Sequence, residues 1–346
     1  MNYTRGMAAA AQLCALAVIA IMCVFPVENN DVFINLKTGE YILEHRALPA
    51  TDPFSFTAGD QPWVNHEWLS ILLLFLTYKA GGLNLLILLK AFMIVLSFGV
   101  ILREAGRWSG NSWLLPFLVL LTGYAASDRF IIRMHIFNNL LLAVYLAALL
   151  RWRDRGGRGL WLPVITLAWV NLHSGAIVAP LLMVVVMAGD WLQRLAEGKF
   201  SPARREPERY SFRQGLIALA LHVPALCLTP YGYKTVLYPL QQASWDIYRH
   251  YVFEWMRVYS PFYIQMPVFK AFLAVAAVLV GAFIVNWRRL RISDLGLAAV
   301  GLVMGASAVR FMDILALIAL AVTARQLASM NWAHGRDRFR LYHQTA

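Results

Sequence analysis

The chain has 346 residues, of which 60% are hydrophobic and only 14% are charged, and its formal net charge is +12. Soluble globular domains have about 25% charged residues, so the composition excludes an ordinary soluble protein and indicates one integral membrane domain over residues 1–346. A positive charge can indicate nucleic-acid binding, but Lys and Arg gather in the cytoplasmic loops of membrane proteins. The excess therefore follows from topology, and no nucleic-acid partner is expected.

Apolar runs recur along the whole chain and predict an all-α, polytopic bundle of about ten transmembrane helices. The expected helices cover residues 7–25, 83–102, 113–126, 136–150, 160–172, 177–192, 215–228, 268–285, 295–309 and 314–324. The run at residues 68–78 is too short to span and is expected to be an interfacial helix in the first outer loop.

The basic residues set the expected orientation of these helices. They place both termini in the cytoplasm and residues 193–213 in a cytoplasmic linker. They also place a first loop at residues 27–82 and a second, aromatic loop at residues 229–267 outside. If the run at 68–78 spanned the membrane, all later loops would be inverted and the basic ones would lie outside.

The first outer loop is the stretch where acid-base chemistry can be held at a membrane surface, because it carries seven carboxylates between two apolar helices. Asp31 lies shortly after the first helix, at the depth of lipid headgroups. A carboxylate there can accept the proton of an incoming hydroxyl while a lipid phosphate departs. The alternative is a solvated loop acid or a cap for a helix that begins near Val32.

His66 and Glu67 are a second candidate pair in this loop. They would present an imidazole and a carboxylate to the same substrate, or Glu67 would only place a favourable negative charge at the start of a helix. Asp52, directly before Pro53, is expected to be a turn residue.

Two more histidines, His135 and His173, are predicted on the same side as His66. A divalent metal held by these residues with Asp31 or Glu67 is conceivable, but the spacing is not that of a metal motif. Hydrogen-bonded structural histidines are the preferred interpretation, so no metal ligand and no definite cofactor is assigned.

Four basic residues are expected at the outer ends of helices: Arg129, Arg133, Lys270 and Arg310. A cation near the bilayer centre costs about 2.5 to 3.5 kcal/mol on insertion scales. A lipid phosphate would neutralise these cations, and a guanidinium group can bind two phosphate oxygens at once. The alternative is pairing with acidic residues of the chain, namely Asp128, Asp313 or Glu254.

Short motifs resemble the GT-C superfamily of membrane glycosyltransferases and, more narrowly, a group of bacterial GT-C-like proteins. The patterns expected there are D-x-W-W-H-L-x-T-G, P-x-T-D-P-F-S-x-T and W-V-x-H-E-W-L in the first loop, then R-P-x-L-F, W-x-N-x-H-G-G and N-P-Y-G. The matching tracts are Asp31-Val-Phe-Ile-Asn-Leu-Lys-Thr-Gly39, Pro49-Ala-Thr-Asp-Pro-Phe-Ser-Phe-Thr57, Trp63-Val-Asn-His-Glu-Trp-Leu69, Arg133-Met-His-Ile-Phe137, Trp169-Val-Asn-Leu-His-Ser-Gly175 and Thr229-Pro-Tyr-Gly232. The chain departs from these patterns at Phe33-Ile34-Asn35, where Trp-Trp-His is expected, and at Met134 and Ser174. If the histidine that Asn35 replaces contacts a sugar or ligand in the family, this chain binds a different donor or is inactive.

The resemblance implies an enzyme of the bacterial inner membrane that moves a sugar from a polyprenyl-phosphate carrier to a glycan, lipid or protein acceptor on the outer face. Asp31, Glu67 and His66 are then the candidate catalytic residues, and the four outer basic residues bind the lipid phosphate. The candidate substrate contacts are His135, Asn171, His173, Tyr231 and Glu254.

A second hypothesis is a non-catalytic subunit or a lipid-linked-glycan transporter in envelope polysaccharide assembly. A transporter is expected to show paired, Gly- or Pro-broken helices at the bilayer midplane. No convincing pair is visible in the sequence, and Asp31 with its basic companions favours the enzyme. The expected partners are membrane lipids and, where the acceptor needs one, a further protein subunit.

Overall fold

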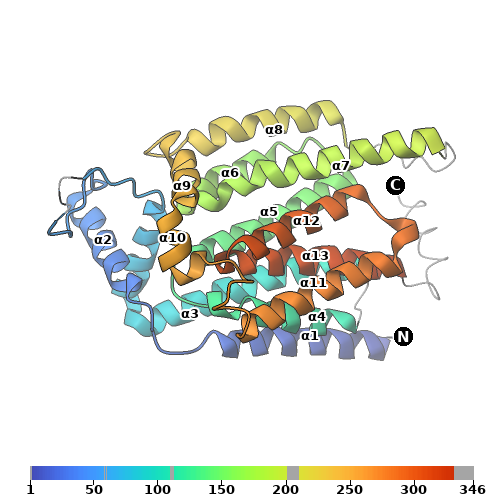
Figure 1. The fold of residues 1–346 in the computed structure, drawn as a ribbon, viewed down its shortest axis with the longest axis horizontal. Coiled ribbons are helices and arrows are strands. Elements are labelled where there is room, and N and C mark those ends of the chain that lie inside the picture. Colours follow the sequence, from blue (N-terminus) through green and yellow to red (C-terminus); the bar gives the residue numbers. More distant parts are fainter. Residues whose placement is uncertain (1, 58, 60, 110–112, 201–209, 331–346) are drawn as a thin grey trace.

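The computed structural model describes residues 2–57, 59, 61–109, 113–200 and 210–330, and this part of the chain is helical without a strand (Figure 1). The long helices are α1 (Asn2–Met22), α2 (Asp31–His45), α3 (Trp68–Ser109), α4 (Leu114–Ala125), α5 (His135–Arg155), α6 (Trp161–Leu172), α7 (Val178–Phe200), α8 (Phe212–Cys227), α9 (Lys234–Ser244), α10 (Asp246–Tyr251), α11 (Pro267–Val285), α12 (Ile292–Ser307) and α13 (Met312–Met330). The short 3-10 helices are η1 (Ser127–Arg129), η2 (Ser174–Ile177), η4 (Phe253–Trp255), η5 (Trp287–Arg289) and η6 (Val309–Phe311).

The membrane character predicted from the sequence is confirmed. Five helices in the described residues are long and apolar enough to cross a bilayer: Trp68–Trp108, His135–Arg155, Ser174–Ala196, Pro267–Val285 and Val309–Ala328. Five further apolar helices have only 10–17 residues: Gly6–Met22, Leu114–Ala125, Trp161–Leu172, Phe212–Cys227 and Ile292–Ser307. Each predicted apolar run overlaps a helix, although the runs 7–25 and 295–309 extend past the ends of α1 and α12. The count of ten spans stays a prediction.

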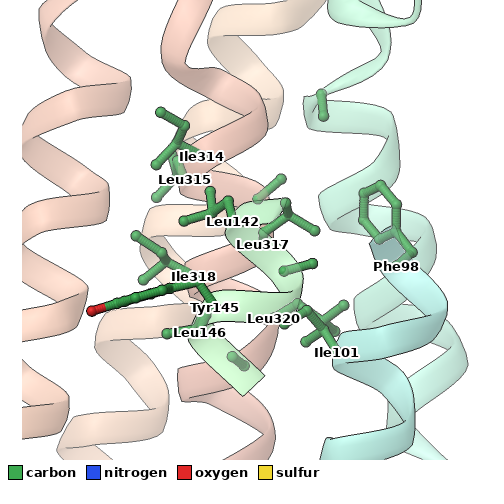
Figure 2. Packing of buried hydrophobic residues seen from close by; sticks show 14 of the residues in the cluster. Phe98, Ile101, Leu142, Tyr145, Leu146, Ile314, Leu315, Leu317, Ile318 and Leu320 are labelled. Carbon is green, nitrogen blue, oxygen red and sulfur yellow. The ribbon is translucent and has the colours of Figure 1, made fainter. Parts of the chain in front are cut away.

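The core lies where α3, α5 and α13 meet. Figure 2 shows Leu142 and Leu146 of α5 beside Ile318 of α13, with Ile101 of α3 close to Leu320. The side chains of α5 and α13 are the most buried of the apolar helices, with 78% and 83% of their central windows inside the bundle. Helices that are apolar on all sides are buried in this way, so these two elements form the axis on which the others pack.

One end of the bundle, here called the loop end, carries α2, α9, α10 and the short helix η4 (Figure 1). The expected break after residue 78 is a kink inside α3, where Gly82 has a φ of 64°, which glycine adopts readily. The segment before the kink packs at the loop end, because Ser70 Oγ donates to the Leu172 carbonyl at 2.6 Å. A Cβ on Gly39 of α2 would overlap Phe75, so α2 lies directly against this segment.

Two details of the loops bear on the sequence analysis. Asp52 is a turn residue as predicted, since its Oδ1 accepts the main-chain N–H groups of Phe54 and Ser55 at 2.9 and 3.1 Å. The helix predicted at 177–192 continues to Phe200, well into the predicted linker 193–213. Strong helix formers such as Leu195 and Ala196 extend it past the apolar segment, and residues 201–209 of that linker lie outside the described residues.

Candidate functional site

The loop end gathers arginines and carboxylates from four regions that are distant in sequence. Arg129 closes η1, Arg133 lies in the turn before α5, and Arg310 lies in η6. Glu254 lies in η4, and Asp31 is the first residue of α2. These five residues are called the arginine cluster below.

Glu254 is the centre of the arginine cluster. Its Oε2 accepts hydrogen bonds from Arg129 Nη1 at 2.8 Å and from Arg133 Nη1 at 2.5 Å. Arg133 Nη2 lies 2.8 Å from Asp31 Oδ2, so this one guanidinium group bridges two carboxylates. Burial raises the pKa of the Glu254 carboxyl, but the arginines outweigh burial and hold the pKa below its usual range. Glu254 is therefore ionised at neutral pH.

Arg310 is held less firmly than the other two arginines. Its Nη1 lies 3.8 Å from Glu254 Oε1, which is too long for a hydrogen bond. The guanidinium instead lies over the ring of Trp255, with its carbon 4.1 Å from the ring centre. Arg129 Nε is also buried, with no hydrogen-bond partner among the described groups. All three guanidinium groups share Glu254, while Asp31 pairs with Arg133 and the nearby Glu67 also acts on Arg310. Arg129 Nε and the loosely held Arg310 leave N–H donors for another anion.

A second group of polar residues lies at the start of α3 and is built around Glu67 and His173. Glu67 Oε1 lies 2.9 Å from His173 Nε2. The other ring nitrogen, His173 Nδ1, accepts the main-chain N–H of Gly175 at 2.9 Å. An imidazole nitrogen that accepts carries no proton, so the proton is on Nε2 and is donated to Glu67.

The turn after α6 fixes this tautomer of His173. A Cβ on Gly175 would overlap Asn138 Oδ1 and lie 2.9 Å from His173 Nδ1, so the approach requires glycine. Asn138 is itself held by Trp169, whose Nε1 donates to Asn138 Oδ1 at 3.0 Å. These hydrogen bonds hold the His173 ring so that its Nε2 faces Glu67.

His66 completes the second group. Its Nε2 lies 3.9 Å from Glu67 Oε1, and its ring lies against Tyr238 of α9 with 4.5 Å between centroids. Burial lowers the pKa of the His66 imidazole. Burial alone would raise the pKa of Glu67, but His173, His66 and the Arg310 guanidinium lower it to about 2. The field of Arg310 reaches both residues, so the second group adjoins the arginine cluster.

Several of the predicted site residues thus meet at the loop end, but four take other positions. His135 Nε2 donates to the Arg129 carbonyl at 2.6 Å and supports η1, while its Nδ1 is buried without a partner among the described groups. Asn171 Nδ2 binds the carbonyls of Leu167 and Leu228, both at 3.0 Å, and so links α6 to the end of α8.

Tyr231 and Lys270 are the other two. The Tyr231 hydroxyl lies near the main chain of Asn65, one residue before His66. Lys270 is exposed near the start of α11, and within the described ranges no ion pair joins it to the arginine cluster.

Three contributors to the site were missed by the sequence analysis: Trp255 under Arg310, Tyr238 on His66, and Asn138 beside His173. The first two were recognised only as part of an aromatic loop. The tract Asn138-Asn139 in an apolar helix is the one local signal that could have indicated Asn138, because buried amides need partners.

No group of three or more His, Cys, Asp or Glu side chains in the described part of the chain is arranged to hold a metal ion. The proton of His173 Nε2 points at Glu67, so that nitrogen is not a free ligand. What the site offers chemically is unpaired guanidinium donors, a half-exposed carboxylate at Asp31 and a partly buried Glu67–His173 pair.

Fold and site together define a helical membrane protein with arginines and carboxylates gathered at one end of the bundle. Comparison of the sequence with protein-family models and with curated proteins gives no match. The function is therefore argued from the geometry of the site.

Proposed function

We propose that this protein is a membrane glycosyltransferase that moves a sugar from a polyprenyl-phosphate carrier to a hydroxyl group of a glycan, lipid or protein acceptor at the loop end. The observation that carries the proposal is the convergence of Arg129, Arg133 and Arg310 on Glu254, with Arg129 Nε left without a hydrogen bond and Arg310 3.8 Å away. A phosphate group at the membrane surface accepts hydrogen bonds from such donors, and its oxygens match the paired N–H groups of guanidinium. The resemblance to the GT-C superfamily supports the same substrate class.

In this reaction the acceptor oxygen attacks the anomeric carbon of the sugar. The bond from that carbon to the phosphate oxygen breaks, and its electron pair leaves with the polyprenyl phosphate. Asp31 takes the acceptor proton, and the arginine cluster binds the departing phosphate, whose negative charge increases in the transition state.

The ion pair between Asp31 and Arg133 couples donor binding to this step. In the free protein Arg133 Nη2 lies 2.8 Å from Asp31 Oδ2, so the guanidinium group occupies one oxygen of this carboxylate. A bound phosphate competes for the same guanidinium N–H groups. Asp31, whose side chain is already 52% exposed, is then released toward the acceptor.

The test is Asp31→Asn in protein reconstituted into vesicles with radiolabelled short-chain polyprenyl-phosphate hexoses and pentoses as donors. Asn keeps the size of the side chain but cannot take a proton. Since general-base assistance is worth about a hundred- to ten-thousand-fold, sugar transfer should fall at least about a hundredfold while donor binding persists.

The matched control is Asp52→Asn, because an Asn Oδ1 can accept the same two main-chain N–H groups and transfer should stay close to wild type. Full transfer by Asp31→Asn would contradict the mechanism and favour a non-catalytic role in polysaccharide assembly.

A further inference from the structure

The segment after α8 crosses the loop end instead of continuing along the bundle. Figure 1 shows α9 and α10 running across the end of the helices α5 to α8, which lie along the long axis of the molecule. In a bundle that spans a bilayer, a helix in this orientation lies parallel to the membrane plane, at the boundary between headgroups and acyl chains.

The inner side of α9 is held against the site by specific contacts. Thr235 is buried, and its Oγ1 lies 2.7 Å from Thr229 Oγ1 in a hydrogen bond. Tyr238 lies on the ring of His66, with 4.5 Å between centroids. These contacts fix which face of α9 points away from the protein.

The outer face of the segment is apolar. On α9 large side chains recur at spacings of three and four residues, which places them on one side of that helix, and α10 adds two more after the break at Trp245. They are all exposed, and no described residue covers them; Ile247 is 64% and Tyr251 is 78% accessible. The residues of this outer stripe are Tyr233, Leu237, Leu240, Ile247 and Tyr251.

The outer stripe follows the apolar helix α8 in the chain. Val223 and Leu228, on and just after α8, are exposed to 66% and 62%, as expected for side chains that face lipid. Lys234 is exposed beside Tyr233, where it meets anionic headgroups, and Trp245 is an aromatic residue of the type that anchors at the interface. The position of the outer stripe after the apolar α8 and the positive charge of Lys234 favour lipid, and not a second protein, as what covers the stripe.

We propose that α9 and α10 lie in the leaflet at the loop end, with the outer stripe in contact with lipid acyl chains and the inner side covering His66. The segment is then an anchor that fixes the depth of the site relative to the bilayer. This inference uses no donor and no transfer step, so it is independent of the proposed function.

The experiment uses the full chain in nanodiscs of phosphatidylethanolamine and phosphatidylglycerol. Single cysteines at Leu237, Leu240 or Ile247 are spin-labelled after Cys14, Cys23 and Cys227 have been replaced by Ala. Power saturation with oxygen and with a water-soluble nickel complex then reports whether each label lies in lipid or in water. Val223→Cys is the lipid standard, and Thr57→Cys, in the exposed part of the first loop, is the water standard.

Labels on the outer stripe should give oxygen-to-nickel ratios near that of Val223→Cys. Ratios near that of Thr57→Cys, or protection from both reagents by a covering protein, would overturn the proposal. A spin label is itself apolar, so Ile247→Cys is measured again with Leu237→Gln and Leu240→Gln. The ratio should shift toward the water standard, and an unchanged ratio would also contradict the proposal.

Discussion

Arg133 is the residue on which the arginine cluster depends, because its two terminal nitrogens reach Glu254 and Asp31 in different segments. A lysine has one nitrogen and could not make this bridge in the same way. Arg310 differs, since its guanidinium lies over Trp255 and is 3.8 Å from Glu254. Its hydrogen-bond donors are consequently the ones most easily turned toward a ligand.

Donor affinity tests this account. Arg133→Ala and Arg310→Ala should each weaken binding of a short-chain polyprenyl phosphate by about 1.5 to 3 kcal/mol, the range for a lost hydrogen bond to a charged group. Binding is measured by titration of the detergent-solubilised protein. Arg257→Ala is the matched control, because Arg257 is exposed at the same end and its contact is with Tyr259. Equal affinities for wild type and both cluster variants would assign these arginines to structure alone.

At the scale of elements, helix positions could be predicted because an apolar run is a local property. The break near Gly81 and Gly82 also followed from local sequence. The partner of Arg129 could not be chosen among three carboxylates, because Glu254 lies 125 positions away and the choice depends on how η1 and η4 pack. The Glu67–His173 pair could not be predicted for the same reason, since it joins the start of α3 to the turn between α6 and α7.

The short element η2 shows how a turn can control a side chain, and Gly175→Ala tests it. The new methyl group would overlap Asn138 Oδ1, which is held by Trp169 and cannot move freely. Such overpacking typically costs about 1 to 3 kcal/mol, so the free energy of unfolding should fall by that amount in a detergent titration.

The control for η2 is Gly99→Ala, since no atom lies within 4 Å of an added Cβ there. In the middle of α3 this change should be neutral or stabilise by about 0.5 to 1 kcal/mol. If Gly175→Ala is as stable as Gly99→Ala, His173 is not fixed by the close approach of this turn.

At the scale of the whole molecule, the two ends of the bundle differ in how their arginines and carboxylates pair. The end opposite the loop end holds a network in which Arg153 donates three hydrogen bonds of 2.7 to 3.0 Å to Asp190, and Arg325 Nη1 donates to Asp154 at 2.8 Å. Arg291 and Asp294 complete it, which gives three arginines and three aspartates. In that network arginines and aspartates are equal in number, whereas three arginines of the arginine cluster share Glu254.

This difference matters for function only if the loop end faces the outside, as the distribution of basic residues predicts. Single cysteines at Thr57 and Arg257 of the loop end should react with a membrane-impermeant maleimide added to intact spheroplasts. Cysteines at Arg158 and Arg288 of the opposite end should react only after the membrane is opened. All four positions are exposed on the protein, so a lack of reaction shows that the membrane blocks the reagent and not that the residue is buried.

Labelling of Arg158→Cys in intact spheroplasts would show that the topology is the reverse of the predicted one and that the arginine cluster lies in the cytoplasm. A donor on the outer face could then not reach Asp31, and the glycosyltransferase proposal in its present form would fail.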